Sequence, residues 1–139
     1  MTTRIRHVVR PVKMILRATV CLPVLTVVAG LSAAPALAQE IREPEMTGTL
    51  ATGRLAFTAK CAACHGTKGQ GTDKGPPFLS RIYHPGHHGD EAFRLAARNG
   101  ARAHHWPFGN MPPVEGLSDA QLDQVIAYIR ALQRANGVF

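Results

Sequence analysis

The sequence predicts a small all-α domain in which three main helices surround a bound group. Two long segments, 50–61 and 118–132, carry apolar residues at helical spacing, and a shorter capped segment lies between them. No segment alternates polar and apolar residues as a half-buried strand does. Large aliphatic side chains are sparse after residue 50, so a chain of this size has little to bury unless something else fills its centre.

The first 38 residues have the pattern of a secretory signal peptide. A basic start is followed by an apolar stretch that ends on Ala36-Leu37-Ala38, a cleavage site of the A-x-A type. An uncleaved membrane anchor is the alternative, because 18–38 could just span a bilayer. Two prolines and the small-residue ending favour cleavage before Gln39. We therefore expect a signal peptide at 1–38, a loose lead-in at 39–47 and one domain at 48–139.

Export through this signal would place the protein in the periplasm, and removal of the segment changes the net charge of the chain. From Gln39 on, eleven basic and nine acidic residues remain, which gives a net charge of +2. This small excess gives no basis for nucleic-acid binding, and no membrane span is expected after cleavage. Cys61 and Cys64 are the cysteines that remain, in an oxidising compartment where free thiols tend to oxidise.

The helices can be placed by their capping signals. The first begins near Leu50, with Thr47 or Thr49 as its cap. A glycine- and proline-rich loop at 66–89 precedes a short helix over Asp90–Asn99, for which Asp90 is the expected N-cap. After a second loop at 101–116, Ser118 and Gln121 form the capping box of the last helix. The apolar stripe of this helix is Leu122, Val125, Ile126, Ile129 and Leu132.

The segment Cys61-Ala62-Ala63-Cys64-His65 carries the strongest chemical signal. Cys-x-x-Cys-His is the attachment pattern of a c-type haem. Two cysteines on one helical turn can reach the two vinyl groups along one porphyrin edge, and the histidine then lies under the ring as an iron ligand. Without the histidine, the cysteine pair alone would also fit zinc or disulfide exchange. One covalently attached haem c is therefore expected per chain, and it would supply the missing centre of the core.

The ordered set of helix, CAACH, glycine-proline loop, short helix, Met-Pro loop and terminal amphipathic helix resembles the class I single-haem cytochrome c domain of bacteria. The resemblance covers about 48–135. It implies that Cys61 and Cys64 bind haem through thioethers and that His65 is the proximal iron ligand. Met111, in Asn110-Met111-Pro112-Pro113, matches the distal sulfur ligand. The two prolines are expected to hold Met111 in an extended conformation.

The resemblance also implies roles for residues around the haem. The carbonyl of Pro76 matches the acceptor for the ligand imidazole, and a simple turn former is the equally weighted alternative for this proline. Gly53 and Phe57 match a first-helix pair that packs against an aromatic of the last helix, here Tyr128. Trp106 either donates its indole N–H to a haem propionate or only packs.

Five loop histidines depart from the family pattern. Together they could form a second metal site, because imidazole suits copper, zinc and nickel, or a docking surface for a metalloprotein. Adjacent residues point in different directions if extended, so only one histidine of each adjacent pair is expected to ligate. His84, His87 and His104 are the candidate ligands on this basis. His88 and His105 lie beside them in sequence. The favoured alternative is that all five are exposed side chains that bind nothing, since no acidic or sulfur ligands cluster with them.

An iron held by both His65 and Met111 has no open position, which indicates an electron carrier rather than an enzyme. Its partners would be redox proteins, a donor and an acceptor that the sequence does not name, and the chain would be a monomer or a subunit of a complex. The alternatives are the haem subunit of a larger oxidoreductase, a copper-handling protein, and a ligand-binding or peroxidatic haem protein with a labile sixth position. The long chain after His65 argues against the gas-binding bundle cytochromes, whose haem motif lies near the C-terminus.

Overall fold

The computed structural model describes residues 40–139. The expected signal peptide at 1–38 and its cleavage site lie outside the described residues. Within residues 40–139 the chain is helical, with no strand and one isolated β-bridge. The prediction of an all-α fold is confirmed. None of the described helices is long and apolar enough to cross a bilayer.

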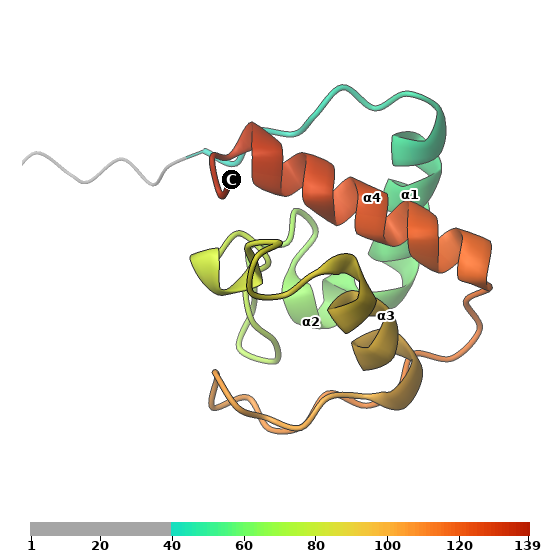
Figure 1. Cartoon of the computed structure of the whole chain (residues 1–139). Coiled ribbons are helices and arrows are strands. Elements are labelled where there is room, and N and C mark those ends of the chain that lie inside the picture. The colour runs from blue at the N-terminus through green and yellow to red at the C-terminus, as the bar shows by residue number, and fades with distance from the viewer. Residues whose placement is uncertain (1–39) are drawn as a thin grey trace, which may run out of the picture. The chain divides into compact units, whose positions relative to one another are not determined.

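The four α-helices are α1 (Gly48–Lys60), α2 (Ala62–His65), α3 (Asp90–Asn99) and α4 (Asp119–Ala135). A 3-10 turn, η1 (Arg81–Tyr83), interrupts the loop between α2 and α3 and was not expected from the sequence. Helix α4 lies across α1 and next to α3, and the loop after α3 runs beneath these helices (Figure 1). Ser118 and Gln121 form the predicted capping box, and the whole predicted apolar stripe of α4 is buried.

The core is centred on the crossing of α1 and α4. Phe57 and Tyr128 are fully buried and meet edge to face, with ring centroids 5.3 Å apart. Gly53 is buried at the same crossing, where an added Cβ would lie 2.0 Å from the carbonyl oxygen of Gln124. The expected packing of this glycine and Phe57 against Tyr128 is confirmed. Glycine is required here because the two backbones approach too closely for any side chain.

The lead-in before α1 has no regular structure, but it is attached to both ends of the domain. Asn136 accepts a hydrogen bond from the backbone N–H of Arg42 and donates one to its carbonyl, at 2.9 and 2.8 Å. Glu43 pairs with Arg54 and Lys68. The lead-in is thus held more firmly than its polar composition indicates.

Replacing Tyr128 with phenylalanine is expected to leave stability unchanged or to raise it by up to about 1 kcal/mol. The hydroxyl of Tyr128 is buried and has no hydrogen-bond partner among the described residues, so its removal also removes a desolvation cost. Chemical denaturation followed by circular dichroism measures the change. A loss of more than about 1 kcal/mol would mean that the hydroxyl does have a partner. Burial, followed by Glu43, raises the pKa of Tyr128, and Arg54 opposes this rise by a smaller amount, so Arg54 is the candidate partner.

Candidate functional site

An apolar cavity of about 800 Å³ opens between α2, α3, α4 and the loop that follows α3. Its volume lies within the range of about 300–1,000 Å³ that is usual for cofactor pockets. Cys64 and His65 contribute to its wall from α2, and Met111 contributes from the loop 101–116. Residues 46 positions apart in the sequence, His65 and Met111, therefore face one space. The apolar walls from α3 and α4 include Phe93, Ala97, Leu122, Val125, Ile126 and Ile129.

His65 has a defined tautomer. Its side chain is buried, and Nδ1 lies 2.9 Å from the carbonyl oxygen of Pro76. A carbonyl can only accept, so Nδ1 carries the proton and the lone pair is on Nε2. Burial lowers the pKa of His65 below its usual value, although the bond to Pro76 acts in the opposite direction. The imidazole is thus neutral at pH 7 and offers Nε2 to a metal.

The loop after α2 folds back around His65 and fixes it. The ring of Phe78 stacks on the imidazole, with centroids 4.2 Å apart and planes 22° from parallel. Gly71 N–H donates to the carbonyl of His65 at 2.7 Å, and Thr72 Oγ1 donates to that of Cys64 at 2.6 Å. Sequence reasoning missed the stacking of Phe78, for which the only signal was an aromatic residue directly after the Pro76-Pro77 pair.

The two cysteines are free thiols, with Cys61 as the N-cap of α2 and Cys64 within that helix. Burial, with a smaller contribution from Cys64, raises the pKa of Cys61 to about 11. Cys61 is therefore a neutral thiol at pH 7. The reactive cysteines of disulfide exchange have lowered pKa values, so the environment of Cys61 argues against a role of the Cys-x-x-Cys pair in disulfide exchange.

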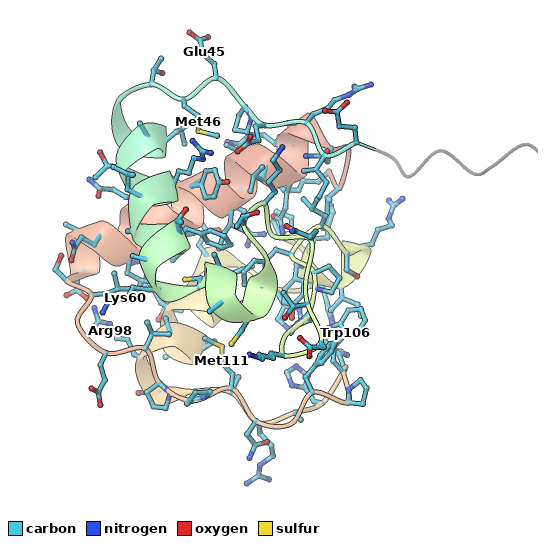
Figure 2. The ribbon with its side chains drawn as sticks, turned by 180° about the vertical axis from the view of Figure 1, so that it is seen from behind. Glu45, Met46, Lys60, Arg98, Trp106 and Met111 are labelled. Carbon is cyan, nitrogen blue, oxygen red and sulfur yellow. The ribbon has the colours of Figure 1, made fainter. Side chains whose placement is uncertain are left out.

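Met111 is fixed through its backbone. Its N–H donates to the carbonyl of Ala101 at 2.8 Å, and its carbonyl accepts from Ala101 N–H at 3.0 Å. This pair is the isolated β-bridge, so Met111 is extended as predicted from the two prolines that follow it. Gly100 precedes the bridge with a φ of 76°, and a Cβ there would lie 2.6 Å from the Met111 oxygen. The side chain points from its loop toward α2 (Figure 2).

Trp106 brings an unpaired polar atom to the same cavity. Its indole nitrogen is buried and has no hydrogen-bond partner among the described residues. Burial raises the pKa of the neighbouring Tyr83, and the indole of Trp106 lowers it by a smaller amount. The two groups are close but lack hydrogen-bond geometry. A buried N–H without a partner costs about 1–3 kcal/mol, so this atom points to a polar acceptor that belongs in the cavity.

The loop histidines are only partly arranged as the sequence suggested. The structure brings together His87, His88 and His105, with one ring nitrogen of each within 4.8 Å of the others. Of the expected ligands His84, His87 and His104, only His87 belongs to this group. The expectation that only one histidine of each adjacent pair would face the site is wrong for His87 and His88, because both contribute a ring nitrogen to this group.

The other two histidines lie beside this group or away from it. His104 is adjacent, with its ring 4.3 Å from that of His105, and its Nδ1 donates to the carbonyl of Arg102 at 2.7 Å. His84 faces elsewhere, because its Nδ1 accepts from Gly86 N–H at 2.9 Å and its ring packs against Phe139. The turn that His84 stabilises reverses the chain directly before His87.

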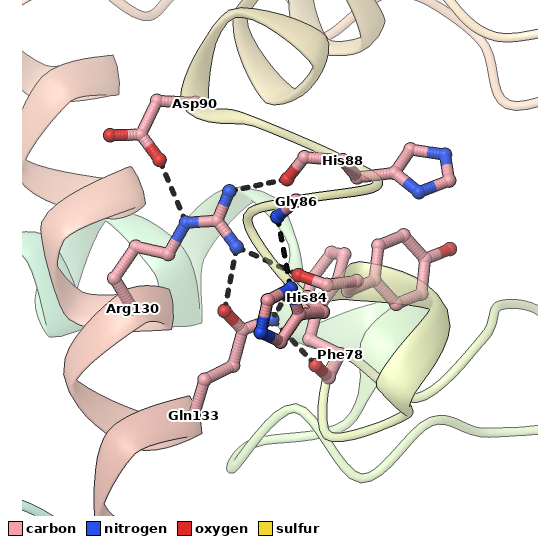
Figure 3. A network of polar contacts seen from close by, with 8 residues as sticks. Phe78, His84, Gly86, His88, Asp90, Arg130 and Gln133 are labelled. Carbon is pink, nitrogen blue, oxygen red and sulfur yellow. Dashed lines mark hydrogen bonds and ion pairs between the residues drawn. The ribbon is translucent and has the colours of Figure 1, made fainter. Parts of the chain in front are cut away.

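A buried arginine of α4 organises the loop that carries these histidines (Figure 3). Arg130 donates from Nε to Asp90 at 2.7 Å, from Nη1 to the carbonyl of Tyr83 at 2.8 Å, and from Nη2 to the carbonyl of His88. The expectation that Asp90 caps α3 is wrong: Gly89 is the N-cap, and Asp90 begins the helix with its carboxylate turned to Arg130. Sequence reasoning missed this network because its members are 40–47 residues apart.

Comparison with known proteins gives one match. A family model described as cytochrome c matches residues 50–133, which is more than half of the chain and includes Cys61, Cys64, His65 and Met111. No curated protein and no solved structure matches at the significance required.

Proposed function

We propose that this chain, which belongs to the cytochrome c family, shuttles single electrons between redox partners with a haem iron bound by His65 and Met111. Membership of the family makes the chain a haem-based electron-transfer protein. The finer assignments are the ligand pair, the exported location and the carrier role. Each of them rests on residues of this chain.

The observation that carries the proposal is that Cys64, His65 and Met111 line one apolar cavity. The donor set is that of a c-type haem: free thiols for thioether bonds, a neutral imidazole and a thioether sulfur. The unpaired N–H of Trp106 fits a haem propionate as its acceptor. The residues present therefore fit one haem c, attached at Cys61 and Cys64.

Bound haem supplies one-electron chemistry at iron, and a Met/His ligand pair raises its reduction potential. The chain's own residues set the conditions for that chemistry. Pro76 fixes the orientation of the His65 ring and increases its basicity as a ligand. The bridge to Ala101 holds Met111 in place, and the walls from α3 and α4 exclude water. If His65 and Met111 both hold the iron, they would leave no coordination position for a substrate, which favours a carrier over an enzyme.

The signal-peptide pattern at 1–38 supports export to the periplasm, where the mature chain would begin at Gln39. The partners would be a donor and an acceptor protein that meet it briefly over a small contact. The net charge of +2 favours neither sign of partner surface.

Intact mass and absorption spectra of the protein exported with its own N-terminus test the proposal. We expect a chain that starts at Gln39, one haem that acid acetone does not extract, and a low-spin ferric spectrum with a sulfur-to-iron absorption. A high-spin ferric spectrum would instead support the ligand-binding or peroxidatic alternative. A mass that retains residues 1–38 would contradict export with cleavage.

A further inference from the structure

Three imidazoles from two separate loops converge at the rim of the cavity. His87 and His88 precede α3, and His105 lies on the loop that follows it. His88 and His105 also line the cavity, next to Trp106. Since His65 and Met111 are not members of this group, it is separate from the residues assigned to haem iron.

The spacing of the imidazole nitrogens is that of ligands on one metal ion. Nε2 of His87 and Nε2 of His105 are 3.2 Å apart. Two nitrogens that each lie about 2.0–2.1 Å from an ion are about 2.8–3.0 Å apart at adjacent square-planar positions and about 3.3–3.4 Å apart at tetrahedral positions, so the observed spacing lies between the two geometries. The ring nitrogen of His88 is within 4.8 Å of both, so the exposed side chains of His87 and His105 have to move toward His88 to close a three-nitrogen site.

His88 is held in the orientation that a metal ligand needs. Its Nδ1 donates to the carbonyl of Ile82 at 2.8 Å, which leaves the lone pair on Nε2. Metal-binding histidines commonly donate their second nitrogen to a backbone carbonyl, because that bond fixes both tautomer and ring direction. The backbone of His88 is in turn held by the buried guanidinium of Arg130.

We propose that His87, His88 and His105 form a binding site for one divalent transition-metal ion, with Cu(II) bound most tightly. Imidazole ligands suit copper, zinc and nickel, and affinity in such a site rises to a maximum at Cu(II). In the part of the chain that the structure describes, the group contains no carboxylate, which disfavours Mg²⁺, Ca²⁺ and Mn²⁺. The fourth position is open to water or to His104, whose ring lies 5.8 Å from that of His88.

Calorimetric titration of the haem-loaded ferric protein with Cu(II) tests this site. The protein carries no polyhistidine tag, and the pH is held about one unit above the ordinary imidazole pKa of about 6.5. We expect one ion per chain, and an electron paramagnetic resonance signal with coupling to several imidazole nitrogens. His87→Ala and His105→Ala should each raise the Kd for Cu(II) at least about 10-fold, and Zn(II) should bind more weakly than Cu(II).

His84→Asn is the matched control, because it removes a histidine of the same loop that lies outside the group. The asparagine oxygen can still accept from Gly86 N–H, as His84 does. The Kd of the His84→Asn variant for Cu(II) should stay within about twofold of the native value. Equal Cu(II) affinity in the native protein and in a His87→Ala/His105→Ala double variant would overturn the proposal and leave a simple hydrogen bond between two rings. An equal loss in His84→Asn would overturn it too. The ferric haem spectrum, recorded for every variant, shows separately whether the haem site is intact.

Discussion

Replacing Met111 with alanine is expected to lower the reduction potential and to let cyanide bind the ferric protein readily. The thioether favours reduced iron, and its loss would remove one of the two proposed ligands through which the protein sets the potential. Axial ligands move haem potentials over a range of about 0.8 V, so the shift should be a sizeable part of that range. Voltammetry gives the potential, and a cyanide titration followed by absorbance gives the affinity.

Met46→Ala is the control, because Met46 is the other methionine that remains after residue 38. It lies in the lead-in, packs against the core and does not line the cavity, so this variant should keep the native potential and spectrum. An unchanged sulfur-to-iron absorption in Met111→Ala would show that Met111 is not the ligand. His104 and His105, which also line the cavity, would then be the first candidates for a second imidazole ligand.

Replacing Gly53 with alanine is expected to destabilise the protein by about 3 kcal/mol. In an exposed helix the same change stabilises by about 1 kcal/mol, so the sign itself is informative. Here the new Cβ would lie 2.0 Å from the backbone oxygen of Gln124 and 3.2 Å from Cβ of Tyr128. Neither atom can rotate away, so α1 and α4 must separate and loosen the contact between Phe57 and Tyr128.

Denaturant unfolding of the ferric protein, followed by circular dichroism, measures this loss. Thr52→Ala is the matched control, because Thr52 is the preceding residue of α1 and its side chain is exposed. That substitution should change the free energy of unfolding by no more than about 0.5 kcal/mol. Equal stability of Gly53→Ala and Thr52→Ala would show that the two helices are not in close contact in solution.

The regular parts of the fold could be predicted because their signals are local. The bounds of α3, the capping box of α4 and its buried stripe all follow from residues within a few turns of one another. The same holds for the five residues from Cys61 to His65, whose spacing is itself the chemical signal. The extended backbone of Met111 follows from its two prolines.

Contacts between distant segments could not be predicted in this way. The stacking of Phe78 on His65 and the bonds of Arg130 join residues that share no periodic pattern. Asp90 looked like a helix cap because capping is the common local role of an aspartate in that position. Its carboxylate instead pairs with an arginine 40 residues away. The sequence could not predict which of the five loop histidines lie together for the same reason, because loop residues have no periodic spacing that indicates their neighbours.

The bridge between Ala101 and Met111 has a consequence for how the chain can vary. Two backbone hydrogen bonds close the excursion 102–110 at its base and fix the backbone of Met111 there. Changes within the excursion that keep Trp106 in the cavity should therefore leave the methionine in place. His104 and His105 lie on this segment beside Trp106. Exchange of these two histidines could thus add or remove the proposed metal ligand without a change to the cysteines, His65 or Met111.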